Sequence, residues 1–207
     1  MPAAREGVPV KEAERRYYLA EVEKLGAETE SLKVETATKR RELSWELARA
    51  KERRVYDFVG EVTESEVQTA VDELNDWATA SKDPITIRLC SPGGSAFDGL
   101  FLYDFIQDIR HQGIHVVTYA MGWAASMASV LSQAGDERII APNAWYMIHE
   151  PSSLTWGKAG DIKREAKMLE ELHDQLCTII ANRATLSKAE ILSRSMDKDW
   201  WMRADEA

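Results

Sequence analysis

Ser126 is a candidate nucleophile in residues 122–129, which read GWAASMAS. Ala124 and Ala128 stand two positions before and after it, and a sharp turn that carries a nucleophile requires small residues there. We expect Ser126 where a strand turns into a helix. There, backbone N–H groups and the positive end of the helix dipole would stabilise developing negative charge. By itself the segment is more typical of tight packing at a helix start than of a nucleophile.

A glycine pair could supply hydrogen-bond donors beside this serine. Residues 91–94 read SPGG and follow a predicted strand, and adjacent glycines let backbone amides turn outward. Loops at the carboxyl ends of neighbouring parallel strands share one edge of the sheet. The amides of Gly94 and Met127 could therefore form an oxyanion hole beside Ser126. The alternative interpretation is a plain Pro-Gly-Gly turn.

A histidine base is available at the end of another predicted strand. His149 follows an apolar strand segment and precedes Pro151, which stops the strand. The other three histidines are expected at a helix end, early in a strand and on the polar side of a helix (His111, His115 and His173). A histidine base needs a carboxylate to hold its tautomer. Spacing alone leaves five carboxylates open: Asp136, Asp161, Asp174, Asp197 and Asp199.

Strands and helices alternate after residue 54, which predicts a mostly parallel sheet with helices packed against it. The expected strands are residues 55–59, 85–90, 114–119, 138–141 and 144–149. Helices are expected at 64–80, after Gly94, from about 125, over 160–184, and from Ser187, where Glu190 completes a capping box. The helix over 160–184 has an apolar stripe and no sheet left to cover, which indicates a subunit contact.

Residues 1–54 have a different character, with 13 basic and 11 acidic side chains and no strand signal. Apolar or small residues recur there every three or four positions, at Tyr18, Val22, Leu25, Thr29, Leu32, Thr36, Leu43, Leu47 and Ala50. This spacing is typical of a coiled-coil helix, although Gly26, Thr29, Thr36 and Lys39 weaken the seam. Two interpretations stay open, a solvated charged helix and an oligomerisation helix.

Composition excludes several classes of protein. The 207 residues carry 26 Lys and Arg against 35 Asp and Glu, and this net charge of −9 argues against nucleic acid as a partner. Two cysteines and four scattered histidines predict neither a disulfide framework nor a metal site. Residues 1–10 lack a secretory signal, and the uncharged residues 112–135 are better explained by a buried strand and helix than by a membrane span. We therefore expect a cytoplasmic protein.

Four segments resemble the proteolytic subunit of the Clp protease in order and spacing. They are SPGG at 91–94, MGWAASMA at 121–128, MIHEP at 147–151 and the stretch 197–207. The resemblance runs from about residue 54 to the end. It implies Ser126 as nucleophile, His149 as general base and Asp199 as the orienting carboxylate, with Gly94 and Met127 supplying the oxyanion-hole amides.

The same resemblance implies the fold and the domain organisation. An α/β fold of the ββα spiral type, shared with crotonases, is expected over residues 55–207. A handle of strand and helix would protrude over about residues 155–184. Residues 1–54 would be an added helical extension, which is similar to that of Clp-type proteases of phages, some of which serve head maturation.

By this resemblance the chain is expected to be a serine endopeptidase that acts on proteins or peptides without a metal or cofactor. Its copies would form a homo-oligomer of stacked rings. The sequence contains no Gly-x-x-x-x-Gly-Lys-Ser/Thr loop, so any ATP dependence would come from a partner. That partner would be a ring-shaped AAA+ unfoldase, or none if the substrate is a phage capsid or scaffold protein.

Three rival functions are open to test. A crotonase-type enzyme would bind an acyl-CoA thioester with the same fold and an oxyanion hole. An α/β-hydrolase would enlist Asp161 and His173, but both lie on one predicted helix and would not both reach Ser126. An inactive scaffold module would use the amino-terminal helix for assembly.

Overall fold

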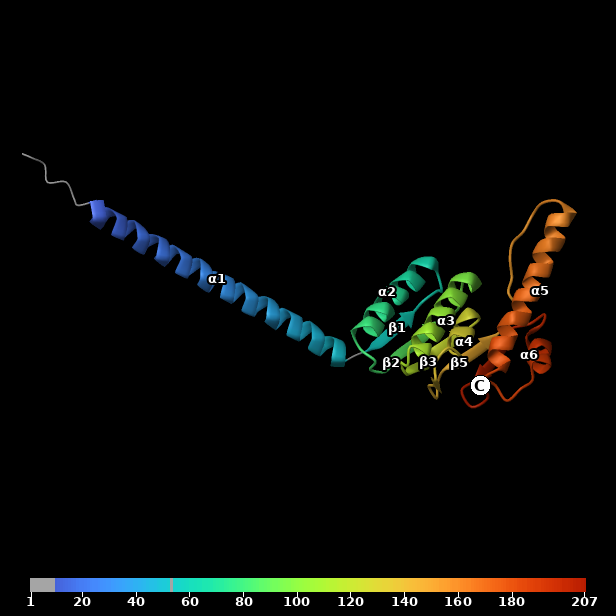
Figure 1. The fold of residues 1–207 in the computed structure, drawn as a ribbon. Helices are drawn as coiled ribbons and strands as arrows, with labels where there is room; N and C mark the ends of the chain where they lie inside the picture. The colour runs from blue at the N-terminus through green and yellow to red at the C-terminus, as the bar shows by residue number, and fades with distance from the viewer. Residues whose placement is uncertain (1–9, 53) are drawn as a thin grey trace, which may run out of the picture. The chain divides into compact units, whose positions relative to one another are not determined.

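The computed structural model describes the backbone of residues 10–52 and 54–207, and the side chains of residues 12, 14–40 and 54–207. Residues 1–9 lie outside this described part, and they include most of the segment (residues 1–10) in which no secretory signal is expected. The chain divides into two compact units, Met1–Glu52 and Arg53–Ala207. Each unit is described by itself below (Figure 1).

The second unit is built on one sheet, as the alternation of strands and helices predicts. Its strands are β1 (Val55–Val59), β2 (Ile85–Ser91), β3 (Val116–Ala125), β4 (Glu137–Ile140), β5 (Trp145–Ile148) and β6 (Trp200–Arg203). The order is β1-β2-β3-β5-β6, with β4 beside β3. All pairings are parallel except that between β5 and β6. The predicted α/β architecture with a mostly parallel sheet is confirmed.

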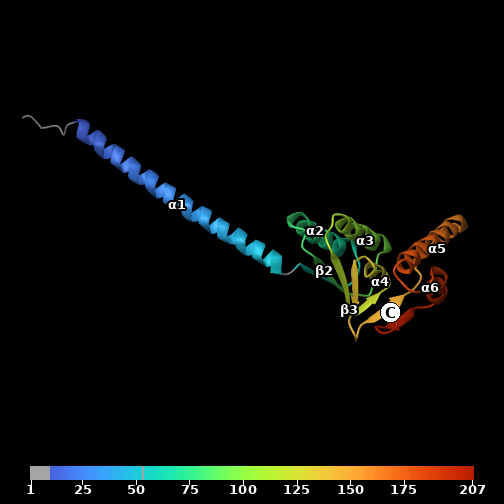
Figure 2. The ribbon, with the colours of Figure 1, turned by 60° about the horizontal axis from the view of Figure 1, so that its bottom comes forward.

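Helices cover the sheet and extend beyond it. They are α2 (Glu64–Ala80), α3 (Ala96–His111), α4 (Met127–Leu131), α5 (Ala159–Ala181) and α6 (Lys188–Ser195). Figures 1 and 2 show α2 and α3 side by side on one face of the sheet. Fully buried aliphatic side chains such as Leu74, Leu89 and Ile106 form the core between them and the strands. The predicted capping box of Ser187 and Glu190 is confirmed at the start of α6.

Strand β3 is longer than the sequence predicts, and it changes partner halfway. Its residues 117–120 pair with β4, whereas residues 123–125 pair with β5. Against β2 the register slips between Leu89, opposite Ala120, and Ser91, opposite Ala124. Gly122 lies within this slip with φ 69°, a backbone conformation that glycine adopts without strain. The bulge lets the end of β3 run beside the end of β5, and this brings residues 126 and 149 together.

The segment before α5 differs from expectation. A handle of strand and helix is predicted there, but residues 151–158 form no strand and pair with none in the sheet. An extended segment becomes a strand only when a neighbour satisfies its backbone N–H and C=O groups. The handle of this chain therefore consists of irregular backbone followed by α5.

The first unit contains one continuous helix, α1 (Val10–Glu52), of 43 residues. Its described side chains are all exposed, including Tyr18, Val22, Leu25 and Leu32 of the predicted stripe. The side chains of Leu43, Leu47 and Ala50 lie outside the described part of the chain.

None of the helices among the described residues is both long enough and apolar enough to cross a bilayer. The uncharged residues 112–135 contain β3 and α4, the strand and helix predicted there.

Candidate active site

Ser126 lies at the junction of β3 and α4, where the sequence predicts a sharp turn. Its backbone has φ 54° and ψ −125°, a region that non-glycine residues rarely occupy and that stores strain at functional sites. The Ser126 amide donates to the Met147 carbonyl oxygen at 2.9 Å, which ties the turn to β5. A Cβ at Gly93 would lie 2.6 Å from the Ser126 Cβ, so the SPGG loop needs glycine to pack here.

The structure brings Ser126, His149 and Asp199 together in one chain of polar contacts. His149 Nε2 lies 2.7 Å from Ser126 Oγ, and His149 Nδ1 lies 3.3 Å from Asp199 Oδ1. Antiparallel pairing sets Ile148 of β5 opposite Trp200 of β6, so the residues just beyond this pair are His149 and Asp199. The His149 side chain is 29% exposed and that of Asp199 is 58% exposed. The imidazole is thus held between a hydroxyl and a partly solvated carboxylate.

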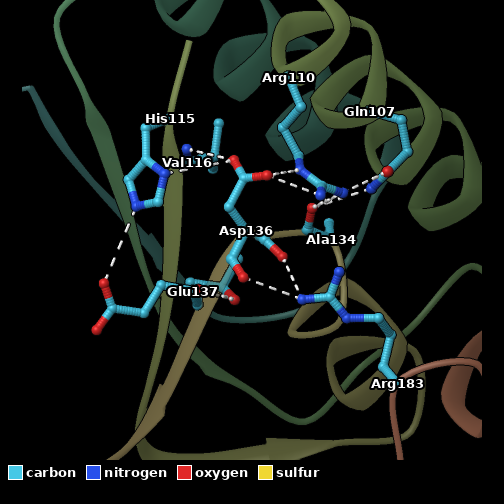
Figure 3. Close-up of polar contacts among 10 residues, drawn as sticks. Gln107, Arg110, His115, Val116, Ala134, Asp136, Glu137 and Arg183 are labelled. Carbon is cyan, nitrogen blue, oxygen red and sulfur yellow. Dashed lines mark hydrogen bonds and ion pairs between the residues drawn. The ribbon is translucent and has the colours of Figure 1, made fainter. Parts of the chain in front are cut away.

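The other four candidate carboxylates lie elsewhere or bind other groups. Asp136 accepts hydrogen bonds from the Arg110 guanidinium, 2.8 Å, and from the Val116 amide, 2.9 Å, in the cluster that Figure 3 shows. Desolvation raises the pKa of Asp136, but these hydrogen bonds outweigh it, so the pKa lies below its ordinary value. Asp161 pairs with Arg164 and Asp174 with Lys188, whereas Asp197 stands in a left-handed turn with φ 58°. Asp199 is the candidate that reaches His149.

The two amides predicted as an oxyanion hole border the same space as Ser126. Gly94 is held by Val62, whose amide donates to the Gly93 carbonyl oxygen at 2.7 Å and whose carbonyl oxygen accepts from the Ser95 amide at 2.8 Å. Gly94 has φ 146°, and an added Cβ would lie 2.3 Å from the Val62 carbonyl oxygen. Within the described part of the chain, neither the Gly94 nor the Met127 amide donates a hydrogen bond. Both amides are therefore available to a ligand.

A cavity of about 400 Å³ opens beside this group. Gly94, Ser126, Met127 and His149 line one side of it. The other side is formed by one face of α5, with the apolar side chains Met168, Leu169, Leu172, Leu176 and Ile180. Glu165 and His173 are ionisable members of the α5 lining, and the apolar side chains beside them can accept an apolar group.

His173 contradicts the expectation that it faces solvent on the polar side of its helix. It is only 5% exposed, and its Nε2 lies 3.0 Å from the Oγ of the buried Ser195 of α6. The expectation was wrong because α6 packs against α5 and covers a face that looks polar when α5 is considered alone. Burial lowers the pKa of His173, and the nearby Glu150 carboxylate offsets this only in part.

A buried network behind Ser126 was not found by sequence reasoning. The Tyr146 hydroxyl donates to the Ser129 carbonyl oxygen and accepts from Gln133 Nε2 at 2.7 Å, while Ser129 Oγ donates to the Ser126 carbonyl oxygen at 2.6 Å. Ser132 lies 2.9 Å from the same Tyr146 hydroxyl. Burial raises the pKa of Tyr146, and these hydrogen bonds moderate the rise. The sequence signal for this network was a tyrosine, Tyr146, within an apolar strand. Its hydrogen-bond partners could not be identified from the strand because they lie in α4 and the turn after it.

Comparisons with known proteins show the family to which the chain is similar. A family model described as Clp protease matches residues 39–207. The ATP-dependent Clp protease proteolytic subunit of Bacteroides fragilis is 42% identical over 132 residues, which are 61% of this chain and 62% of that protein. Proteolytic subunit 3 of Rhodococcus jostii is 38% identical over 72% of this chain and 74% of its own length. Subunit 3 of Rhizobium meliloti is 30% identical over 76% and 79%. The match therefore spans about three fifths of the length of the Bacteroides relative.

Proposed function

The chain belongs to the Clp protease family, and we propose that it is a serine endopeptidase with Ser126 as nucleophile. His149 Nε2 takes the proton from Ser126 Oγ as the oxygen attacks a peptide carbonyl, and the amides of Gly94 and Met127 bind the oxyanion. Asp199 holds the imidazolium through Nδ1–H. His149 then protonates the leaving amine, and water hydrolyses the acyl-enzyme by the same route. Family membership and the observed sheet confirm the predicted fold class.

The observation that carries the proposal is the 2.7 Å contact between Ser126 Oγ and His149 Nε2 at the mouth of a cavity. Proton transfer requires a base within about 2.6–3.2 Å of the hydroxyl. The strained backbone at Ser126 and the unengaged amides of Gly94 and Met127 support the proposal, because acyl transfer needs an exposed nucleophile and donors for the oxyanion. An acyl-CoA enzyme of the crotonase type would need the amides but would not need this Ser–His contact.

We further propose that the substrate is a protein or peptide with an apolar side chain next to the cleaved bond. Leu172, Leu176 and Ile180 of α5 line the same cavity as Ser126. Burial of a leucine-sized side chain there contributes about 1.5–3 kcal/mol of binding free energy. A negatively charged side chain in the same place would lose solvation, and the carboxylate of Glu165 in the cavity lining would repel it.

The partners proposed for this chain follow from the names of its relatives. Those proteins are called proteolytic subunits and ATP-dependent, which describes assemblies that contain more than one component. We propose that this chain forms a homo-oligomer of stacked rings and that an AAA+ unfoldase supplies ATP hydrolysis. A phage capsid or scaffold protein is the substrate to test if no unfoldase is required.

The proposal is tested by labelling the full chain with a serine-directed fluorophosphonate and locating the adduct by mass spectrometry. We expect one adduct, on Ser126, and hydrolysis of short peptides that stops in Ser126→Ala. Ser153→Ala, at the rim of the same cavity, is the matched control and should label normally. An unlabelled wild-type chain would favour the scaffold or acyl-CoA alternatives, and full peptidase activity in Ser126→Ala would remove Ser126 from the mechanism.

A further inference from the structure

Helix α1 presents a regular apolar seam that no described residue of its own unit covers. With Val22 assigned to position a of a heptad, the a positions are Val22, Thr29 and Thr36 and the d positions are Tyr18, Leu25 and Leu32. The four apolar members are 56–66% exposed. The helix is continuous throughout this stretch, so all six side chains lie along one side of it.

Two of the seam residues are threonines, whose hydroxyl groups would be costly to bury without hydrogen-bond partners. In the structure both hydroxyl groups have such partners. Thr29 Oγ1 donates to the Leu25 carbonyl oxygen at 2.7 Å, and Thr36 Oγ1 donates to the Leu32 carbonyl oxygen at 2.7 Å. Because each hydroxyl is satisfied within its own helix, burial of the threonine leaves no polar group without a partner. The methyl group of each threonine remains available for packing against a second helix.

The residue types at the seam indicate how many helices the coiled coil contains. All three a positions are β-branched, and two of the three d positions are leucine. β-Branched residues at a with leucine at d favour two parallel helices over trimers or tetramers. Lys39 occupies the next d position and Arg15 the preceding a position, so the seam covers about three heptads.

Charges that flank the seam select the parallel orientation. The g positions hold Glu28 and Glu35, and the following e positions hold Lys33 and Arg40. In a parallel pair, each g residue faces the e residue of the next heptad on the other helix, so Glu28 meets Lys33 and Glu35 meets Arg40 of a second copy. An antiparallel pair would place glutamate against glutamate and cation against cation.

These glutamates have only weak competing partners on their own helix. Glu35 lies 3.2 Å from Lys39, and Glu28 lies 4.0 Å from Lys24, with both pairs exposed. Exposed pairs of this kind contribute about 0.3–0.5 kcal/mol, so exchanging them for contacts between helices costs little.

We propose that α1 pairs with α1 of a second copy of this chain as a parallel, in-register, two-stranded coiled coil over residues 18–40. Three heptads give a weak contact on their own, because each helix buries only six seam side chains. Oligomerisation of the peptidase unit would raise the effective concentration of the helices and make the pairing persistent. The proposal does not depend on catalysis by Ser126.

Disulfide formation in the full chain tests the pairing. In a parallel in-register pair, Leu25 at d faces Leu25 of the second copy, so Leu25→Cys should give a disulfide-linked dimer under mild oxidation. Ala27→Cys, two residues away at position f, is the matched control, and the wild-type chain measures the background from Cys90 and Cys177. We expect at least 10-fold more dimer from Leu25→Cys than from Ala27→Cys on a non-reducing gel. Equal yields would overturn the proposal.

Charge reversal tests the orientation in the Leu25→Cys chain. Glu28→Lys with Glu35→Lys should sharply reduce the disulfide yield, because lysine then faces Lys33 and Arg40 of the second copy. Adding Lys33→Glu and Arg40→Glu should restore it. The parallel pairing of g with e positions would be excluded if the two glutamate substitutions left the disulfide yield unchanged. It would also be excluded if adding Lys33→Glu and Arg40→Glu did not restore the yield.

Discussion

The contribution of Asp199 to catalysis tests the proposed mechanism, because its exposure limits how strongly it can stabilise a charged His149. Asp199→Asn keeps the shape of the side chain and removes the charge that would stabilise the imidazolium formed during attack. The pair is separated by 3.3 Å, and the Asp199 side chain is 58% exposed. Asp199→Asn should therefore lose less activity than the same Asp→Asn substitution does in a protease whose triad carboxylate is buried.

The size of the loss follows from the distance. Two unit charges 3.3 Å apart interact by about 1.3 kcal/mol in bulk water and by about 5 kcal/mol at an effective dielectric constant of 20. These limits correspond to a fall in kcat of about 10-fold and about 5,000-fold. Because the pair is partly solvated, we expect a value between them, about 100-fold. KM should change little, because Asp199 does not line the cavity.

The assay is steady-state hydrolysis of short fluorogenic peptides with an apolar residue before the cleaved bond. The rate of fluorophosphonate labelling gives a second readout of nucleophile activation. Asp197→Asn is the control, since Asp197 lies two residues away and asparagine tolerates its left-handed backbone as well as aspartate does. If Asp199→Asn kept more than half of wild-type kcat, or if Asp197→Asn lost as much, Asp199 would not be the orienting carboxylate.

Three other substitutions or conditions test the surroundings of the site. Tyr146→Phe removes a buried hydroxyl that donates to the Ser129 carbonyl oxygen and accepts from Gln133 Nε2, so the free energy of unfolding should fall by about 1–3 kcal/mol at about 0.5–1.5 kcal/mol for each lost hydrogen bond; an unchanged denaturant midpoint would contradict this. Gly93→Ala would press a Cβ to within 2.6 Å of the Ser126 Cβ, so peptide hydrolysis should fall at least 10-fold while circular dichroism stays native; normal turnover would show that the turn tolerates the methyl group. Burial lowers the pKa of His173, so the unfolded chain binds the proton more readily and stability should drop as the pH falls below about 6.5. Thermal melts between pH 7.5 and 5.5 should show this drop in the wild type and a smaller one in His173→Gln, and parallel slopes would exclude His173 as the cause.

Features that depend on neighbours along the chain could be predicted from the sequence. The alternation of apolar segments indicated the strands and helices, and the Ser187–Glu190 capping box was confirmed. Ser126, Gly94 and His149 were each placed at a strand end because loops at the carboxyl edge of a parallel sheet converge. That reasoning needs only local patterns and one rule of topology.

Features that depend on pairing between distant segments could not be predicted in this way. Spacing left five carboxylates open, and Asp199 was selected by family resemblance, because β6 reaches His149 only through antiparallel pairing with β5. The bulge at Gly122, the buried network of Tyr146 and the burial of His173 each depend on a packing partner far along the chain. The amino-acid order thus determined which residues could react and where strands and helices form. Tertiary packing decided which of those residues touch, since contact distances depend on register and on helix packing that no local pattern encodes.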